Sequence, residues 1–474
     1  MNALLLFTFF VASSDAEKLQ DEYKEWIVPV TLFDSLGPPP QDLLSKNEAD
    51  NFLRSSNRSS QVKQKKLPPR YSVGVLNVDA SSQNTNEISM SRQHFFTFDL
   101  GNPSQTILLT EKCKGCFSSL EPESGCPKIV PKCESLFEDQ ISTLNTQFCW
   151  PSHPQQYLPE NSYRYIIKDC PLKKGETQNA GTLDNIPICI ACFDGGDHSR
   201  YYTFAETDFS FVGATQINTI ESNDGTFSRH SAPASKIKHF EFGALVRTVP
   251  QRDRIWSNIG IGANSSFMQQ LPAHSFLFDF DYYGVKYEHQ GERIIFNPDP
   301  KLYETWAQSP YIIQHHRHHV IERFYFGSTI GNAPTNIDFF MDTGNDGISI
   351  YDTDLLEFLA YETNGSWKED TTDPNNYGVS RLLVPYSREN APDLSLVLSP
   401  GISVTLPGYS WVFDNGLYDL GSELNPTIFV QDEENILGLP FLTAPGYSFV
   451  FEDREKTLYI SHGSDSYPSY SSIS

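Results

Sequence analysis

The sequence is poor in basic residues and, beyond its first residues, has no long apolar run. Its 474 residues include 35 Lys or Arg against 59 Asp or Glu, a formal net charge of −24. Such an excess of carboxylates repels the phosphates of nucleic acids and anionic lipid headgroups. No segment reaches the ~20 apolar residues of a membrane-spanning helix. We therefore expect neither nucleic acid nor a membrane span.

Several motifs with a known chemistry are absent as well. The sequence contains no His-Glu-x-x-His, no Gly-x-Ser-x-Gly and no phosphate-binding glycine loop. No motif therefore indicates a metalloprotease, a serine hydrolase or a nucleotide-binding protein. We expect no cofactor. Sustained helical periodicity is scarce, whereas 33 Phe and 23 Tyr are present. Because aromatic side chains pack well on pleated surfaces, the sequence predicts an all-β protein.

The first residues have the pattern of an export signal. An apolar run from Ala3 to Ala12 is followed by small residues at Ser13, Ser14 and Ala16, which predicts a signal peptide over residues 1–16. We expect the protein to be secreted, and to be extracellular or in the endolysosomal lumen. The Asn-x-Ser patterns at Asn57, Asn264 and Asn364 are then possible glycosylation sites.

Eight cysteines, an even number, fit an oxidising compartment and disulfide bonds. They are Cys113, Cys116, Cys126, Cys133, Cys149, Cys170, Cys189 and Cys192. Two pairs with Cys-x-x-Cys spacing could instead form a zinc site. The histidines His315, His316, His318 and His319 could bind a metal or sense acid, or lie in a solvated turn between strands. Export favours disulfides over zinc for the cysteines. For the histidines, the sequence shows none of the surrounding ligands that a built metal site requires, which favours the solvated turn. We expect no metal.

The length of the chain exceeds the usual size of one hydrophobic core, which predicts two lobes. A polar stretch with three prolines, Pro38 to Pro40, and a basic cluster, Lys63 to Lys66, reads as a separate segment. It is either a removable propeptide or a solvated linker. The expected organisation is a signal peptide at 1–16, this segment at 17–70, an N-terminal β lobe at 71–298 with a cysteine-rich insertion at 113–196, a C-terminal β lobe at 299–463 and a flexible tail at 464–474.

A family resemblance rests on several motifs in order. An apolar strand ends in Asp342-Thr343-Gly344, and Ile436-Leu437-Gly438 and a closing strand at 447–455 follow it. This part of the chain resembles the C-terminal lobe of pepsin-like aspartic proteases. In the first half, residues 95–105 resemble the family's opening strand and turn, and residues 258–262 resemble its hydrophobic-Gly strand. The resemblance implies an all-β, bilobal pepsin-like fold with a central cleft.

The resemblance also implies a site in which each lobe supplies one aspartate and the pair shares a proton. Asp342, with Thr343 and Gly344, is the second of these catalytic motifs. The first is expected within residues 108–116, which hold no aspartate, and Glu111 is a weak substitute. Asn345 stands where the family usually has Ser or Thr. The ligand-covering hairpin is expected near residues 201–208, with Tyr202 and Phe204 as loose binding candidates.

The sequence therefore predicts a secreted, monomeric relative of these enzymes that binds a peptide or protein in its inter-lobe cleft without cleaving it. One alternative is an active aspartic endopeptidase that uses Asp342 with a partner such as Glu111. The other is a structural or interaction glycoprotein that uses its cysteine-rich insertion rather than the cleft.

Overall fold

The computed structural model describes much of the two lobes and parts of the segments between them. The described residues are 24–30, 32–33, 72–73, 75–77, 93–107, 166–167, 177–183, 186–192, 199–211, 214–221, 227–235, 237–249, 257–279, 293–327, 333–345, 347–369, 380–413 and 423–462. All structural statements below concern these residues.

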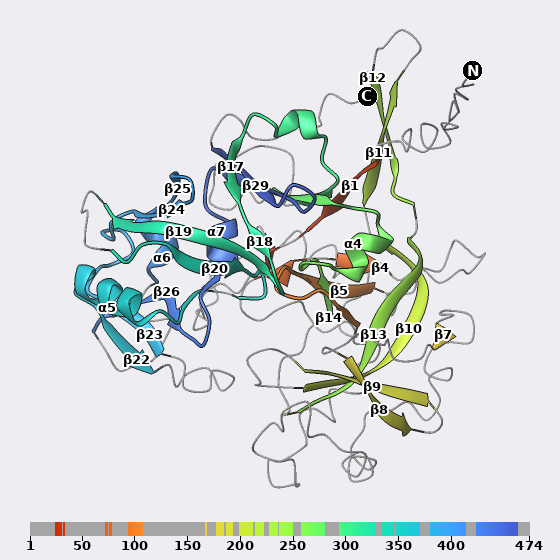
Figure 1. The fold of residues 1–474 in the computed structure, drawn as a ribbon, viewed down its shortest axis with the longest axis horizontal. Helices are drawn as coiled ribbons and strands as arrows, with labels where there is room; N and C mark the ends of the chain where they lie inside the picture. Colours follow the sequence, from red (N-terminus) through yellow and green to blue (C-terminus); the bar gives the residue numbers. More distant parts are fainter. Residues whose placement is uncertain are drawn as a thin grey trace, which may run out of the picture.

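The described chain is mostly β-sheet, and Figure 1 shows two lobes with further strands between them. The few helices are short, namely α4 (Ser266–Gln270), the 3-10 helix η6 (Pro300–Leu302), α5 (Thr353–Glu362), α6 (Gly408–Trp411) and α7 (Leu439–Leu442). None of the helices in the described part is long and apolar enough to cross a membrane. The predicted all-β, two-lobed architecture is confirmed.

The N-terminal lobe is built on one sheet with the strand order β13-β6-β14-β5-β4-β10-β9-β8. The strands are β4 (Val75–Asn77), β5 (Gln93–Asp99), β6 (Gln105–Ile107), β8 (Thr177–Leu183), β9 (Ile186–Cys192), β10 (Ser199–Phe211), β13 (Ile237–Val249) and β14 (Ser257–Gly260), and β7 (Ile166–Ile167) pairs with β10. In the middle of this sheet β5 and β14 run parallel, whereas β14 and β6 run antiparallel.

The C-terminal lobe is built on a second sheet, ordered β22-β23-β26-β21-β27-β20-β19-β24-β25. Its strands are β19 (Arg317–Phe326), β20 (Ile337–Met341), β21 (Ile348–Ile350), β22 (Ser366–Glu369), β23 (Ser380–Val384), β24 (Leu394–Leu398), β25 (Ile402–Leu406), β26 (Asn425–Gln431) and β27 (Ile436–Leu437), and β18 (Ile312–Ile313) pairs with β19. The arrangement of the first lobe recurs here, because β20 pairs with β27 in parallel and β21 pairs with β27 antiparallel.

A third sheet joins strands from both halves of the chain, in the order β12-β11-β1-β16-β15-β28-β29-β17. They are β1 (Lys24–Pro29), β11 (Thr215–Glu221), β12 (Phe227–Pro233), β15 (Ser275–Asp279), β16 (Arg293–Phe296), β17 (Ala307–Pro310), β28 (Tyr447–Glu452) and β29 (Thr457–His462). The pairing of β15 with β28 makes this sheet continuous between the two halves. A separate pair is formed by β2 (Leu32–Phe33) and β3 (Ser72–Val73).

Strand β1 is an element that the sequence analysis did not anticipate. It lies inside the 17–70 segment, pairs with β11 on one side and β16 on the other, and buries Trp26 and Val28. A strand in the middle of a sheet has both backbone edges satisfied by its neighbours. This part of the segment is therefore a structural strand and not a solvated linker.

Aromatic side chains fill much of the core, as the composition predicted. Phe209 stacks on Phe240 with ring centroids 4.3 Å apart in the first lobe. Phe276 of β15 stacks on Phe451 of β28 at 5.0 Å, which packs the two halves of the third sheet against each other. Ring pairs of this kind add to the stabilisation that comes from burial alone.

Candidate active site

The C-terminal lobe presents Asp342 at the end of strand β20. Phe339 and Met341 of this strand are fully buried, so packing fixes the strand, and the backbone N–H of Asp342 donates to the carbonyl oxygen of Leu437 on β27 at 3.1 Å. The backbone N–H of Gly344 donates to Oδ1 of Asp342 at 2.7 Å. The turn after β20 thus holds the carboxylate in one orientation.

The N-terminal lobe presents Asp99 at the end of strand β5 in the same way. Strand β5 pairs in parallel with β14, and the backbone N–H of Ile261, just after β14, donates to the carbonyl oxygen of Asp99 at 2.8 Å. The N–H of Gly101 donates to Oδ1 of Asp99 at 3.0 Å, two residues along the chain, as Gly344 does for Asp342. In each lobe, therefore, a core strand leads into a turn that carries an aspartate, and we call these the aspartate turns, at Asp99 and at Asp342.

The two aspartate turns lie against each other. The N–H of Gly101 is also 3.1 Å from Oδ1 of Asp342, so one donor serves a carboxylate of each lobe. A Cβ atom built on Gly101 would fall 2.5 Å from Cγ of Asp342, which only a glycine at this position avoids. Oγ1 of Thr343 accepts from the N–H of Leu100 at 2.9 Å and donates to the carbonyl oxygen of Phe98. These contacts clamp the turns together.

The surroundings of the two carboxylates differ. Burial raises the pKa of Asp342, while hydrogen bonds from Gly344, Asp99 and Gly101 oppose the increase and the charge of Glu434 adds to it. On the other side, Nδ2 of Asn258 lies 3.3 Å from Oδ2 of Asp99 and donates to it. Two close carboxylates cannot both ionise easily, and donors favour the charge on the group that receives them. The arrangement therefore favours one proton shared by the two carboxylates.

The structure corrects the expected position of the first aspartate. The expectation that the N-terminal lobe offers no aspartate opposite Asp342 is wrong, because Asp99 lies there. Residues 95–105 form not the opening strand of the lobe but its aspartate-bearing strand and turn. Glu111, the weak substitute, lies outside the described residues.

The sequence contained a signal that could have found Asp99. Asp99-Leu100-Gly101-Asn102 and Asp342-Thr343-Gly344-Asn345 are the same Asp-x-Gly-Asn pattern, each preceded by an apolar strand. In both turns the asparagine Oδ1 accepts a backbone N–H two residues on, from Ser104 at 2.8 Å and from Gly347 at 2.8 Å. An internal comparison of the two halves would have revealed this repeat.

The remaining predicted residues lie elsewhere. Tyr202 and Phe204 are inside β10, opposite Leu245 and Gly243 of β13, and not at the turn of a hairpin. Their role as binding residues stays a prediction. Asn345 directs its side chain into its own loop, where Nδ2 donates to Oγ of Ser349 at 2.7 Å.

The predicted modification and metal sites are only partly within the described chain. Asn264 and Asn364 are exposed, whereas Asn57 lies outside the described residues, and glycosylation stays a prediction. Cys189 and Cys192 lie in β9 and the other cysteines fall outside, so the disulfides are likewise untested. The described part of the chain contains no cluster of His, Cys, Asp and Glu able to hold a metal ion.

The expectation of a solvated turn around the four histidines is wrong for part of that segment. Strand β19 begins at Arg317, and both Arg317 and His319 are buried. Neither ring nitrogen of His319 has a hydrogen-bond partner among the described residues, and burial, with the positive charge of Arg317, lowers its pKa to about 3. His319 is therefore a neutral core residue at most pH values.

Comparisons with known proteins find a similarity of fold. No family model matches the chain, and no curated protein matches it. Among solved structures, an aspartic proteinase from Irpex lacteus is similar over 83% of this chain and 94% of its own, with 12% sequence identity and a TM-score of 0.45. That likeness concerns the fold alone. The assignment of a site rests on the two aspartate turns themselves.

Proposed function

We propose that the protein is an aspartic endopeptidase whose catalytic pair is Asp99 and Asp342. The observation that carries the proposal is the shared donor: the N–H of Gly101 reaches Oδ1 of both carboxylates. Two carboxylates held this close, one ionised and one protonated, are the arrangement that activates water for attack on an amide.

The chemistry follows from the sharing of one proton by the two carboxylates. The ionised carboxylate of the pair accepts a proton from a water molecule as the water oxygen bonds to the peptide carbonyl carbon. The protonated carboxylate donates its proton to the carbonyl oxygen. The C–N bond then breaks as the amine nitrogen takes the proton held by the first carboxylate, and the proton on the former carbonyl oxygen returns to the second.

Cleavage of an unfolded protein between pH 3 and 7 by the purified chain, compared with Asp99→Asn and Asp342→Asn, tests this proposal. Each variant removes one member of the pair and should lower kcat/KM by about 10²–10⁴-fold. A Glu111→Gln variant is the matched control and should cleave like the wild type. Cleavage that survives in Asp99→Asn but not in Glu111→Gln would contradict the proposed pair.

A second candidate function, peptide binding without turnover, is favoured by one specific feature. Leu100 occupies in the first turn the place that Thr343 has in the second, and a leucine cannot form the reciprocal hydrogen bonds across the lobes. If the wild type cleaves no protein at any pH, capture of an unfolded peptide that Asp342→Asn weakens would support this candidate.

A further inference from the structure

The side chain of Arg317 is completely buried at the junction of the three sheets. It belongs to β19 of the C-terminal lobe, and its solvent exposure is 1%. Its guanidinium carbon lies 5.0 Å from the ring centroid of Phe276 and 5.8 Å from that of Phe451, both in the third sheet. A buried charge is costly unless it is paired and fully hydrogen-bonded. The position therefore needs specific partners.

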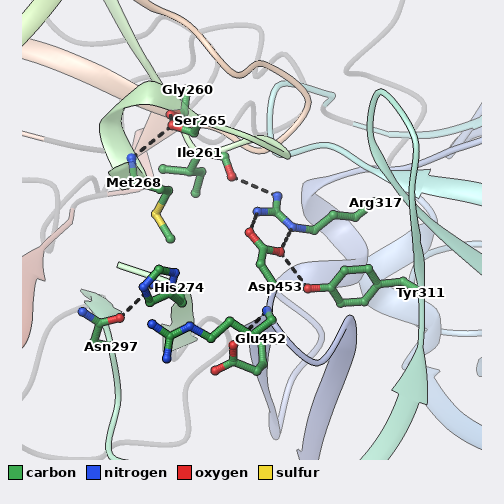
Figure 2. Close-up of polar contacts among 11 residues, drawn as sticks. Gly260, Ile261, Ser265, Met268, His274, Asn297, Tyr311, Arg317, Glu452 and Asp453 are labelled. Carbon is green, nitrogen blue, oxygen red and sulfur yellow. Dashed lines mark hydrogen bonds and ion pairs between the residues drawn. The ribbon is translucent and has the colours of Figure 1, made fainter. Parts of the chain in front are cut away.

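Arg317 has partners on both sides, as Figure 2 shows. Nε and Nη2 donate to Oδ1 and Oδ2 of Asp453 at 2.6 Å each, the geometry of a bidentate pair. The hydroxyl of Tyr311 donates to Oδ1 of Asp453 at 2.7 Å. On the opposite side, Nη1 donates to the carbonyl oxygen of Ile261, in the N-terminal lobe, at 2.9 Å. Although burial alone would lower the pKa of Arg317, the charge of Asp453 raises it, so the guanidinium stays charged.

The contact with Ile261 leads directly to the first aspartate. The carbonyl of Ile261 accepts from Arg317, and its N–H donates to the carbonyl oxygen of Asp99 at 2.8 Å. At the other end, β19 is the strand paired with β20, and Asp342 directly follows the last residue of β20. One side chain thus connects the strand next to Asp342 with the residue that holds the backbone of Asp99.

We propose that Arg317 is a positioning residue that fixes the separation of Asp99 and Asp342 by tying Ile261 of one lobe to β19 of the other. The inference rests on the proposed function, because it concerns the geometry of the same pair. Asp453 and Tyr311 hold the guanidinium in the orientation that reaches Ile261. Misplacement of reacting groups by about 1 Å can cost about 10²-fold in rate.

Arg317→Lys tests the proposal, since it keeps the positive charge but loses the fork that bonds Asp453 and Ile261 together. We expect kcat to fall by about tenfold or more with a smaller change in KM. As the carboxylates separate, they influence each other less, so the two apparent pKa values of the pH–rate profile should approach each other by about one unit. Loss of folded protein alone would lower the rate without moving this profile.

The matched control is Arg293→Lys. Arg293 also pairs with an aspartate, its Nε lying 2.7 Å from Oδ2 of Asp279, but this pair links neighbouring strands of the third sheet. The variant Arg293→Lys should leave the gap between the two apparent pKa values of the pH–rate profile unchanged. Wild-type kcat and an unchanged gap in Arg317→Lys, or the same profile change in Arg293→Lys, would overturn the proposal.

Two further measurements keep the inference separable from the proposed function and from folding. If Arg317→Lys does not fold, the double variant Arg317→Gln with Asp453→Asn removes both buried charges and should show the same narrowed gap. If the wild type cleaves nothing, the proposed function fails, and crystal structures of the wild type and the variant then decide. A larger Asp99–Asp342 separation in the variant supports positioning, and an unchanged separation contradicts it.

Discussion

The turn at Asp99 and the turn at Asp342 share a sequence pattern but differ in how they are held. Thr343 reaches across to the first turn, whereas its counterpart Leu100 is buried and contributes no side-chain hydrogen bond in return. Beside the first turn, Asn258 donates to Asp99. By strand register, the corresponding position beside Asp342 is the apolar Ile436.

The two lobes therefore supply different contacts to the carboxylate pair. The C-terminal turn supplies Thr343, whose hydroxyl bonds the backbone of the first turn, and the N-terminal lobe supplies Asn258, a side-chain donor to Asp99. The pair is therefore asymmetric in its local donors even though the strands that carry it are arranged alike. Substitutions at corresponding positions should have unequal effects.

The largest difference in kcat/KM is expected between alanine substitutions of the two glycines, Gly101 and Gly344. A Cβ atom at Gly101 would lie 2.5 Å from Cγ of Asp342, whereas one at Gly344 would be 3.1 Å from Oδ1 of the same residue. Gly101→Ala must push the carboxylates apart, so we expect kcat/KM to fall by about 10²-fold or more. Gly344→Ala should cost about tenfold or less, measured on the same substrate. Equal losses would show that the two turns crowd the pair to the same degree.

A smaller effect is expected at Thr343, whose hydroxyl joins the two aspartate turns. Thr343→Val keeps the shape but leaves the N–H of Leu100 and the carbonyl of Phe98 without their partner, which should lower the free energy of unfolding by about 2–4 kcal/mol. Leu100→Ile, which removes no hydrogen bond, should cost less than about 1.5 kcal/mol. Denaturant unfolding of both variants measures the comparison, and a Leu100→Ile cost as large as that of Thr343→Val would refute the one-sided clamp.

The smallest expected effect is a shift of the pH profile. Asn258→Ile makes the first lobe resemble the second and removes a donor to the Asp99 carboxylate. Loss of this donor destabilises the ionised form of the carboxylate pair, so the acidic limb of kcat/KM against pH should move upward by about one unit or less. Ile436→Val, a conservative change at the corresponding position, should leave the limb in place. A downward shift in Asn258→Ile would contradict the assigned donor.

Part of this picture could be predicted from local sequence. Strands β16 and β20 are short apolar runs of the kind that local sequence identifies as strands, and the motif at Asp342 lies where an apolar strand ends. The Asp-x-Gly-Asn repeat could have indicated Asp99, but its place opposite Asp342 depends on the parallel pairing of β5 with β14, two strands far apart in the sequence. Strand β1 was missed for the same physical reason, since its burial comes from β11 and β16 and not from its own pattern. The buried Arg317 likewise needs Asp453 and Ile261, which no local pattern joins to it.

The most direct test of the account is the titration of the two carboxyl groups in protein labelled with ¹³C at aspartate Cγ. If Asp99 and Asp342 share a proton, one signal should titrate well above the ordinary aspartate range in the wild type. In Asp99→Asn, the remaining signal of Asp342 should titrate as a single group at a different pKa, because the carboxylate that shares its proton is gone. Two carboxyl groups that titrate independently, each unaffected by neutralising the other, would contradict the paired site.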